Sequence, residues 1–543
     1  MFDAKSILNS VLRKYYFVVL SFLYFFLLTY WLRSGLPESK FVFNLVYAFL
    51  NSVILLSLII LIAKIPKASY ILAFILTLII TADITHKLVY GTLLSIGGIA
   101  SMFETNTAEA KGFLLLSVKE WLPAFILTLG VTILSTYKLS KNKISGLYVT
   151  CTLFIAFVMV VSSIMLSRSQ EEREQGWEEF ATAPELFIQT NISSRAPLGI
   201  NAGIASFSYW NEMRKFKKEA SSPKVLIDGL SLQNKEVAPQ TIFLVIGESS
   251  LRTHYSLYGY DLPTTPFMDS LKLAKELLSY EALSVAPITR EALRMTLSFA
   301  SPLDQTPFFK NENIVTMSNQ AGYDSYWISN QDKVGMHDSF IGLLASYAKM
   351  SKFYRFEKDD IELLDDVKSL FDPSKKQIFF VHLRGSHLDY RDKFDDIDVE
   401  SLKVGNDRID VIDYDRSIHH TDRVLSELNS FVLSLEKDST ASSIIVYYSD
   451  HGEIINKGHG IMGEGSEQFK IPFVIIPHNV KLDISQIMNS YIVDGIFNSN
   501  SITYVMSQVL GYTIDPQLEK KALNEAEYYY HVDGKKYKIK DLR

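Results

Sequence analysis

The sequence predicts two parts of different fold class, an α-helical membrane domain with five spans and an α/β/α domain whose sheet is mainly parallel. Two observations carry this prediction. Long apolar stretches gather in residues 1–167, and from about Val237 onward short apolar strands alternate with helical segments. Such alternation is typical of a parallel sheet with helices on both faces.

The composition favours a membrane protein with more than one domain. The chain has 543 residues, of which 48% are hydrophobic and 21% charged, and this length exceeds that of one ordinary domain. The formal net charge of −6 gives no support to nucleic-acid binding. One cysteine, Cys151, excludes both an intramolecular disulfide and a cysteine-rich zinc site.

Five stretches approach or reach the roughly 20 apolar residues that cross a bilayer. They are residues 15–32, 41–63, 69–82 with an interrupted continuation to 90, 121–137 and 147–166. The first lacks a small-residue cleavage site, so we expect an anchor and not a removed signal peptide. Lysine and arginine gather before the first span, between spans two and three, and between spans four and five. This pattern predicts a cytoplasmic N-terminus and places the chain after Ser167 outside, in the periplasm of a bacterium.

Two segments lie between the spans and the second part. Residues 168–223 are charged and carry aromatic side chains that fit helices lying on a membrane surface, and we expect them to bridge to residues 224–543. The loop 91–120 lies on the outer face, where Thr105 and Glu109 would share the side of the second part. An exposed connecting turn explains the same loop residues.

Three apolar runs of the second part each end in residues that bind metals. Glu248 follows residues 241–246, His387 follows residues 377–383, and Asp450 with His451 follows residues 443–448. Ligands bind at the carboxyl ends of strands in open α/β sheets, and catalytic zinc takes carboxylates and imidazoles. Each residue alone fits a helix cap or a loop, but three such strand ends together favour a metal site.

The remaining elements complete the alternation. Residues 322–328 and 471–476 are predicted strands, and residues 291–299 and 414–436 are predicted helices. The first of these helices follows Pro287, Ile288, Thr289 and Arg290, so an anion bound near Thr289 would be favoured by the helix N-terminus.

These residues also form motifs in a specific order. The motifs are GESSLRTHYSLYGY with a following TTP, then ITRE, RGSH, YDRSI, and SDHGE with a following HG. The series resembles that of the bacterial phosphoethanolamine transferases, which decorate lipid A or the lipopolysaccharide core and belong to the alkaline phosphatase and sulfatase superfamily. The five spans and an ETN…EA outer loop match as well, so the resemblance covers nearly the whole chain.

The resemblance implies a role for each matching position. The implied zinc ligands are Glu248, Thr289, Asp450 and His451, with Thr289 also the nucleophile. The residues implied beside the substrate phosphate are His387 and His459, which in some members hold a second zinc ion and which can protonate the leaving group. Further candidates for substrate binding are Thr105, Glu109, Asn330 and Lys333. One zinc ion is expected.

The implied reaction is a ping-pong transfer. Thr289 attacks phosphatidylethanolamine, diacylglycerol leaves, and the phosphoethanolamine held on Thr289 passes to a hydroxyl or phosphate of lipid A or the lipopolysaccharide core. Three features differ from lipid A-modifying members and favour a core-sugar acceptor: the soluble part lacks cysteine, His451 and His459 are closely spaced, and Ser101 replaces an asparagine. We expect a monomer in the inner membrane that contacts membrane lipids and no nucleic acid.

Three other functions would share part of this sequence pattern. A phosphoglycerol transferase shares the spans and the threonine, but the outer loop and the SDHGE motif favour the ethanolamine branch. A sulfatase enzyme needs Cys or Ser in a C/S-x-P-x-R context, which residues 289–293 lack. A non-catalytic membrane scaffold would have lost at least one metal ligand, and none is missing.

Overall fold

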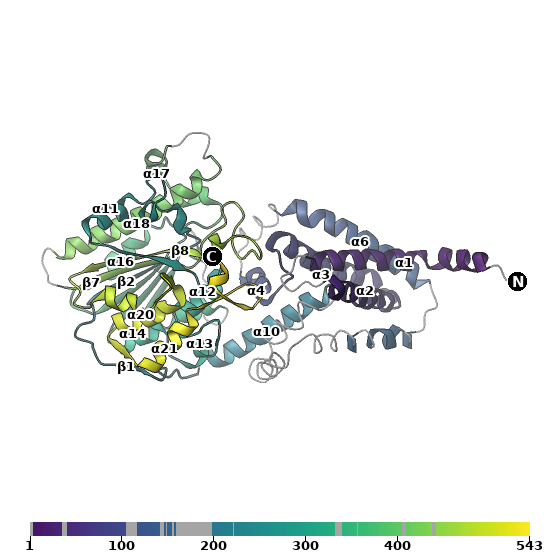
Figure 1. Cartoon of the computed structure of the whole chain (residues 1–543), viewed down its shortest axis with the longest axis horizontal. Coiled ribbons are helices and arrows are strands. Elements are labelled where there is room, and N and C mark those ends of the chain that lie inside the picture. Colours follow the sequence, from purple (N-terminus) through teal and green to yellow (C-terminus); the bar gives the residue numbers. More distant parts are fainter. Residues whose placement is uncertain are drawn as a thin grey trace. The chain divides into compact units, whose positions relative to one another are not determined.

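The computed structural model describes the chain except residues 1–3, 35–40, 105–116, 142–145, 148, 155–156, 159–197, 221, 332–338, 356, 404–408, 437–440 and 543. Contacts divide the chain into two compact units. The first comprises residues 1–214 and 461–463, and the second comprises residues 215–460 and 464–543. Figure 1 shows helices alone in the N-terminal part and a sheet between helices in the C-terminal part.

Four helices of the first unit's described residues are long and apolar enough to cross a membrane. They lie in α1 (Ala4–Arg33), α2 (Phe41–Ala63), α3 (Ser69–Tyr90) and α6 (Val118–Ser140), and a shorter helix, α4 (Ile96–Glu104), follows α3. They coincide with the first four predicted spans. The fifth predicted span lies largely outside the described residues. Within the unit, α1 packs against α2 and α3 packs against α6.

The third span is one unbroken helix, although charged residues interrupt its apolar sequence. Asp83 is fully buried, and its carboxylate accepts hydrogen bonds from Gly199 N at 2.9 Å and Asn201 Nδ2 at 2.8 Å. Both donors lie at the start of α10 (Ile200–Ala220). The buried charge is therefore matched by donors, as a carboxylate away from water requires.

In its described residues, the second unit is built on a nine-stranded sheet with the order β5-β4-β6-β2-β7-β8-β3-β10-β9. The strands are β2 (Thr241–Gly247), β3 (Leu278–Leu283), β4 (Asp324–Ser329), β5 (Met350–Phe353), β6 (Gln377–His382), β7 (Ser443–Ser449), β8 (Lys470–His478), β9 (Ile492–Val493) and β10 (Ile496–Asn498). The run from β5 to β7 is parallel. β8 is antiparallel to both β7 and β3, so the sheet is mixed, and the predicted parallel arrangement holds for the strands from β5 to β7.

Helices cover the sheet on both faces (Figure 1). On one face lie α11 (Pro266–Ala274), α16 (Leu363–Leu370) and α18 (Ile412–Glu436). The helices on the other side include α12 (Thr289–Thr296), α14 (Ile314–Gln320), α20 (Ile502–Val509) and α21 (Pro516–Glu525). Shorter elements are α13 (Pro307–Lys310), α15 (Phe340–Ser346), α17 (Asp396–Ser401), α19 (Ile484–Asn489), and the strand pairs β1 (Leu230–Leu232) with β11 (Tyr512–Ile514) and β12 (Tyr528–Tyr530) with β13 (Lys536–Lys538).

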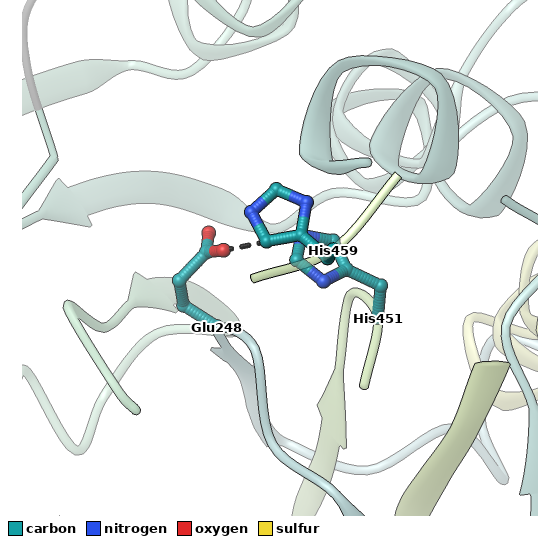
Figure 2. Close-up of side chains that lie close together, drawn as sticks. All are labelled: Glu248, His451 and His459. Atoms are coloured by element: carbon teal, nitrogen blue, oxygen red, sulfur yellow. Dashed lines mark ion pairs between the residues drawn. The ribbon is translucent and has the colours of Figure 1, made fainter. Parts of the chain in front are cut away.

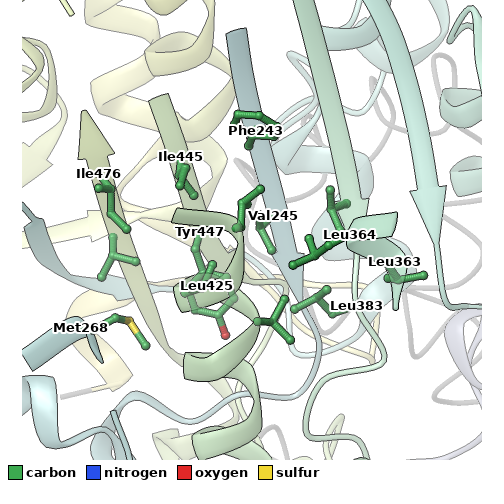
Figure 3. Close-up of a cluster of buried hydrophobic side chains, with 14 of the residues drawn as sticks. Phe243, Val245, Met268, Leu363, Leu364, Leu383, Leu425, Ile445, Tyr447 and Ile476 are labelled. Carbon is green, nitrogen blue, oxygen red and sulfur yellow. The ribbon is translucent and has the colours of Figure 1, made fainter. Parts of the chain in front are cut away.

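The central strands are buried along their whole length and apolar between their end residues, because both faces of the sheet are covered. Every residue of β2, β6 and β7 is buried. Figure 3 shows one side of this core, where Phe243, Val245, Ile445 and Tyr447 of the sheet meet Leu425 of α18. Burial on this scale gives the sheet a rigid edge on which polar side chains can be held.

The strand register aligns the carboxyl ends of β2, β6 and β7, which precede the predicted metal-binding and substrate-binding residues. Ile246 of β2 pairs with His382 of β6 and with Tyr448 of β7. Two further hydrogen bonds continue the alignment past the strands, from Leu383 N to Ile246 O at 2.9 Å and from Asp450 N to Gly247 O at 3.1 Å.

Candidate active site

The four predicted zinc-binding side chains meet at the carboxyl end of β2 and β7. Thr289 Oγ1 lies 3.2 Å from Glu248 Oε2 and 3.2 Å from His451 Nε2. His451 Nε2 lies 3.2 Å from Glu248 Oε1 and 3.3 Å from Asp450 Oδ2. Residues from three separate parts of the sequence therefore direct oxygen and nitrogen atoms at one point.

Thr289 reaches this point because it is the first residue of α12. Ile288 before it is extended, with φ −146° and ψ 140°, and Ala292 N donates to Ile288 O at 2.9 Å as the helix begins. The preceding segment is fixed by Val285 N, which donates to Ser499 Oγ at 2.8 Å. The hydroxyl thus lies at a helix N-terminus, where free N–H groups and the helix dipole favour an anion.

Two further histidines, His387 and His459, lie beside the four side chains. The ring centroid of His459 lies 4.0 Å from that of His451 and 5.7 Å from that of His387. Ligand atoms of Glu248, His451 and His459 all lie within 4.8 Å of one another, and Figure 2 shows these three side chains converging. The two histidines that the resemblance assigns to the substrate phosphate are therefore part of the same cluster.

The proton on His459 can be assigned from its partner. His459 Nδ1 lies 3.1 Å from Pro287 O, and because a carbonyl oxygen only accepts, Nδ1 is the donor. Burial, followed by the neighbouring rings of His451 and His387, lowers the pKa of His459 well below its usual value. His459 is therefore neutral near pH 7, with an unprotonated Nε2.

The site concentrates negative charge that the described protein groups do not balance. Glu248 and Asp450 are 2% and 0% exposed. Burial, reinforced by Glu248, raises the pKa of Asp450 to about 8, and burial also raises the pKa of Glu248. Within the described residues, the ion pairs of both carboxylates are with His451 and none is with lysine or arginine.

This donor set fits a divalent cation. Asp450 Oδ2 is buried, and in the described part of the chain no hydrogen bond of good geometry reaches it. Two buried carboxylates, an imidazole nitrogen and a hydroxyl are ligands that zinc takes, and a cation would offset the cost of burying two carboxylates side by side.

Asn330, a further predicted substrate-binding residue, makes its hydrogen bonds away from this point. Asn330 is fully buried, and its amide Nδ2 donates to Lys358 O at 2.8 Å and to Asp360 Oδ1 at 2.8 Å. Thr105, Glu109 and Lys333 lie outside the described residues.

Three site neighbours were missed from the sequence. Ser249 has the positive φ of 55°, and its Oγ donates to Glu248 Oε1 at 3.0 Å. Gln331 Nε2 donates to Leu383 O at 2.8 Å and lies 3.5 Å from Glu248 Oε2. Glu453 is fully buried and accepts from Tyr390 Oη at 3.1 Å. Glu453 stands in the SDHGE motif, Ser249 stands in the GESSLRTHYSLYGY motif, and Gln331 follows a predicted strand.

A second acidic group has metal-binding spacing but is already neutralised by protein groups. It consists of Asp395, Asp398 and His420. Asp398 accepts from His420 Nδ1 at 2.8 Å, from His419 Nδ1 at 2.6 Å and from Arg423 Nη1 at 2.9 Å. Because a guanidinium and two imidazoles bind this carboxylate, the group forms an ion-pair network joining α17 to α18.

Comparisons with known proteins agree with the predicted resemblance. Residues 240–512 match the Sulfatase family. The chain is 24% identical over 457 residues to "Phosphoethanolamine transferase EptC" of Escherichia coli, covering 76% of this chain and 74% of that protein. It is 23% identical over 466 residues to "Phosphoethanolamine transferase CptA" of Salmonella typhimurium, covering 80% and 78%.

One solved structure matches nearly the whole length of this chain. The integral membrane protein lipooligosaccharide phosphoethanolamine transferase A (EptA) from Neisseria meningitidis matches 95% of this chain and 97% of its own, with a TM-score of 0.58 and 16% identity. This likeness confirms the predicted fold class, in which membrane helices precede a domain of alkaline phosphatase type.

Proposed function

The chain belongs to the sulfatase family, and from this premise we propose that it transfers phosphoethanolamine from phosphatidylethanolamine to a lipopolysaccharide acceptor. The observation that carries the proposal is the position of Thr289 Oγ1, a nucleophile within 3.2 Å of both a carboxylate and an imidazole. The names of the relatives EptC and CptA support the choice of transferred group.

Glu248, Thr289, Asp450 and His451 would hold one zinc ion. When bound, zinc would lower the pKa of the threonine hydroxyl and offset charge on the phosphoryl group. The orphaned oxygen of Asp450 and the absence of a lysine or arginine ion pair to either described carboxylate support this assignment. We propose one ion for the resting enzyme, and metal analysis would reveal a second.

In the first half-reaction, Thr289 Oγ1 attacks the phosphorus of the donor. The Oγ1–P bond forms, the bond from phosphorus to the diacylglycerol oxygen breaks, and the hydroxyl proton leaves toward Glu248, with which Oγ1 is hydrogen-bonded. The N-terminus of α12 offers N–H groups to the phosphoryl oxygens. Phosphoethanolamine remains covalently bound to Thr289.

The two histidines would take different parts in proton transfer. His459 is neutral, with Nδ1 donating to Pro287 O, so its Nε2 is a proton acceptor and suits the base that activates the incoming acceptor. His387 is half-buried, and we assign to it the proton that the departing diacylglycerol oxygen takes. In the second half-reaction the acceptor gives its proton to His459 Nε2 as its oxygen bonds to phosphorus, the Oγ1–P bond breaks, and Thr289 Oγ1 takes back the proton held by Glu248. Transfer of the proton from His459 to His387 then restores the resting enzyme.

The membrane helices would keep the enzyme in the bilayer that contains its donor. A membrane anchor raises the effective concentration of a lipid substrate without any added contact. We propose the bacterial inner membrane with the second unit in the periplasm, because lysine and arginine favour a cytoplasmic N-terminus. The acceptor would be lipid A or, as the lack of cysteine in the soluble part favours, a core sugar.

Mass spectrometry of lipopolysaccharide tests the proposal. Cells lacking the gene, complemented with the wild-type chain or with Thr289→Ala, should differ in one phosphoethanolamine group, present only with the wild type. An identical lipopolysaccharide in both strains, with both proteins expressed, would refute the proposed acceptor class. Fragmentation of the modified species locates the group on lipid A or on the core.

A further inference from the structure

A buried aspartate outside the zinc-binding group holds the loop that carries His387. Asp360 is 7% exposed. Its two carboxylate oxygens each lie 3.0 Å from Arg384 N, and Oδ2 also accepts from Gly385 N at 2.9 Å. Oδ1 accepts in addition from Asn330 Nδ2 at 2.8 Å. Two consecutive backbone N–H groups of the loop are therefore bound by one carboxylate.

The same loop lies directly against the backbone of Glu248. Gly385 has a φ of +57°, and a Cβ at this position would lie 2.6 Å from Glu248 O and 2.7 Å from Glu248 N. Ser386 N donates to Glu248 O at 2.9 Å. The position of this loop therefore affects both the carboxylate ligand Glu248 and His387, which follows one residue later.

We propose that Asp360 is a positioning residue of the transfer reaction. Asp360 binds the backbone of residues 384 and 385. The loop then keeps His387 at the phosphoryl site and holds the backbone of Glu248 in place. This inference rests on the proposed function. It also gives Asn330 a role other than substrate binding, because the Asn330 amide fixes the carboxylate of Asp360.

The turn that carries Asp360 is itself anchored on α18. Asp359 Oδ1 lies 3.0 Å from His420 Nε2, and His420 Nδ1 donates to Asp398 at 2.8 Å. These two carboxylates outweigh the effect of burial and raise the pKa of His420 to about 9, so the imidazolium is charged near pH 7. Asp360 thus holds the loop, and its neighbour Asp359 is fixed to α18, the longest helix in the described part of the second unit.

A carboxylate suits this position better than a neutral side chain of the same shape. Both oxygens of Asp360 accept, whereas an asparagine would turn its NH₂ group toward either the backbone N–H groups or the Asn330 amide. Asp360→Asn should therefore loosen the loop without changing the volume of the side chain.

Asp366 provides a matched control. It is 9% exposed and accepts from Lys352 Nζ at 2.6 Å and from Tyr354 Oη. In the described part of the chain, these hydrogen bonds join Asp366 to β5 and the residue after it, and not to residues 384–387. Asp366→Asn removes a similarly buried charge from the same domain. Gly385→Ala is a second test variant, because its Cβ would collide with the Glu248 backbone and displace the loop while Asp360 stays intact.

The test uses the full-length chain in detergent. Hydrogen–deuterium exchange of peptides covering residues 383–387 should be about tenfold faster in Asp360→Asn than in the wild type or Asp366→Asn, while peptides of β2 and β7 stay protected. The kcat should fall about 100-fold with KM within about threefold, and Gly385→Ala should repeat this pattern.

Two outcomes would overturn the assignment. One is exchange in residues 383–387 no faster than in Asp366→Asn, and the other is a loss of kcat no greater than in that control. If the wild type transfers no phosphoethanolamine at all, the proposed function fails separately, and the exchange measurement alone then decides whether Asp360 holds the loop.

Discussion

Thr289 Oγ1 and His451 Nε2 lie 3.2 Å apart although 162 positions separate them in the chain. Thr289 begins a helix, whereas His451 follows a central strand by two residues. Their meeting explains why a hydroxyl that is a poor nucleophile in water becomes a candidate for catalysis.

Removal of this hydroxyl should abolish turnover and leave the fold intact. Thr289→Ala removes the hydroxyl and the γ-methyl group at a partly buried position, so we expect the melting temperature to change little while transfer falls by about 1,000-fold or more. Thr289→Ser keeps the hydroxyl and should retain part of the activity. Transfer to lipopolysaccharide acceptor in vesicles measures both variants, and wild-type turnover by Thr289→Ala would rule out this nucleophile.

Zinc content should depend on each proposed ligand. Glu248→Ala, Asp450→Ala and His451→Ala each remove one donor and should lower the zinc that remains after dialysis. Thr289→Ala should lower it least, because a hydroxyl is the weakest ligand of the four. Elemental analysis of the purified full-length chain gives the stoichiometry. Full occupancy in the first three variants would contradict the site.

The zinc-free protein should lose stability as pH rises. The pKa of Asp450 is raised to about 8, whereas an unfolded aspartate titrates near about 4. Between these values the folded state binds more protons than the unfolded state, so the free energy of unfolding falls with increasing pH.

Melting temperatures of the zinc-free chain at pH 6 and pH 8 measure this effect. We expect the lower value at pH 8, a smaller difference with zinc bound, and a smaller difference in Asp450→Asn, which cannot ionise. Equal pH dependence in Asp450→Asn and the wild type would show that another group is responsible.

The leaving group should decide how much His387 matters. If His387 protonates the diacylglycerol oxygen, His387→Ala should slow transfer from phosphatidylethanolamine by about 100-fold or more. With a phosphoethanolamine ester of an acidic phenol, whose oxygen needs no proton, the same variant should stay within about tenfold of the wild type. His459→Ala serves as the comparison, and equal losses on both donors for His387→Ala would remove the acid assignment.

The outer loop supplies a prediction that rests on sequence alone. Glu109 would hold the ammonium of the donor, so Glu109→Ala should raise KM for phosphatidylethanolamine about tenfold or more and leave zinc content unchanged. Glu109→Gln keeps the hydrogen bonding and should be intermediate. Turnover on vesicles of graded donor content is the measurement, and an unchanged KM in both variants would make this loop a connector.

Much of the site was predictable because its residues stand next to strong local signals. β2, β6 and β7 are apolar between their end residues, and Glu248 and Asp450 follow two of them directly, so the approach of these two carboxylates follows from parallel pairing. The direction of β8 was not predictable, since an apolar run reads the same in parallel and antiparallel strands. The roles of Asp360 and Asn330 were not predictable either, because their partners at residues 384 and 385 become neighbours only through the fold.

The most direct test of the central claim is peptide mass spectrometry of the wild-type chain after incubation with phosphatidylethanolamine in the absence of acceptor. We predict a phosphoethanolamine group on the peptide that contains Thr289, formed together with diacylglycerol and lost when lipopolysaccharide is added. Diacylglycerol release without any modified peptide, or a modification at another residue that turns over at the same rate, would contradict transfer through Thr289.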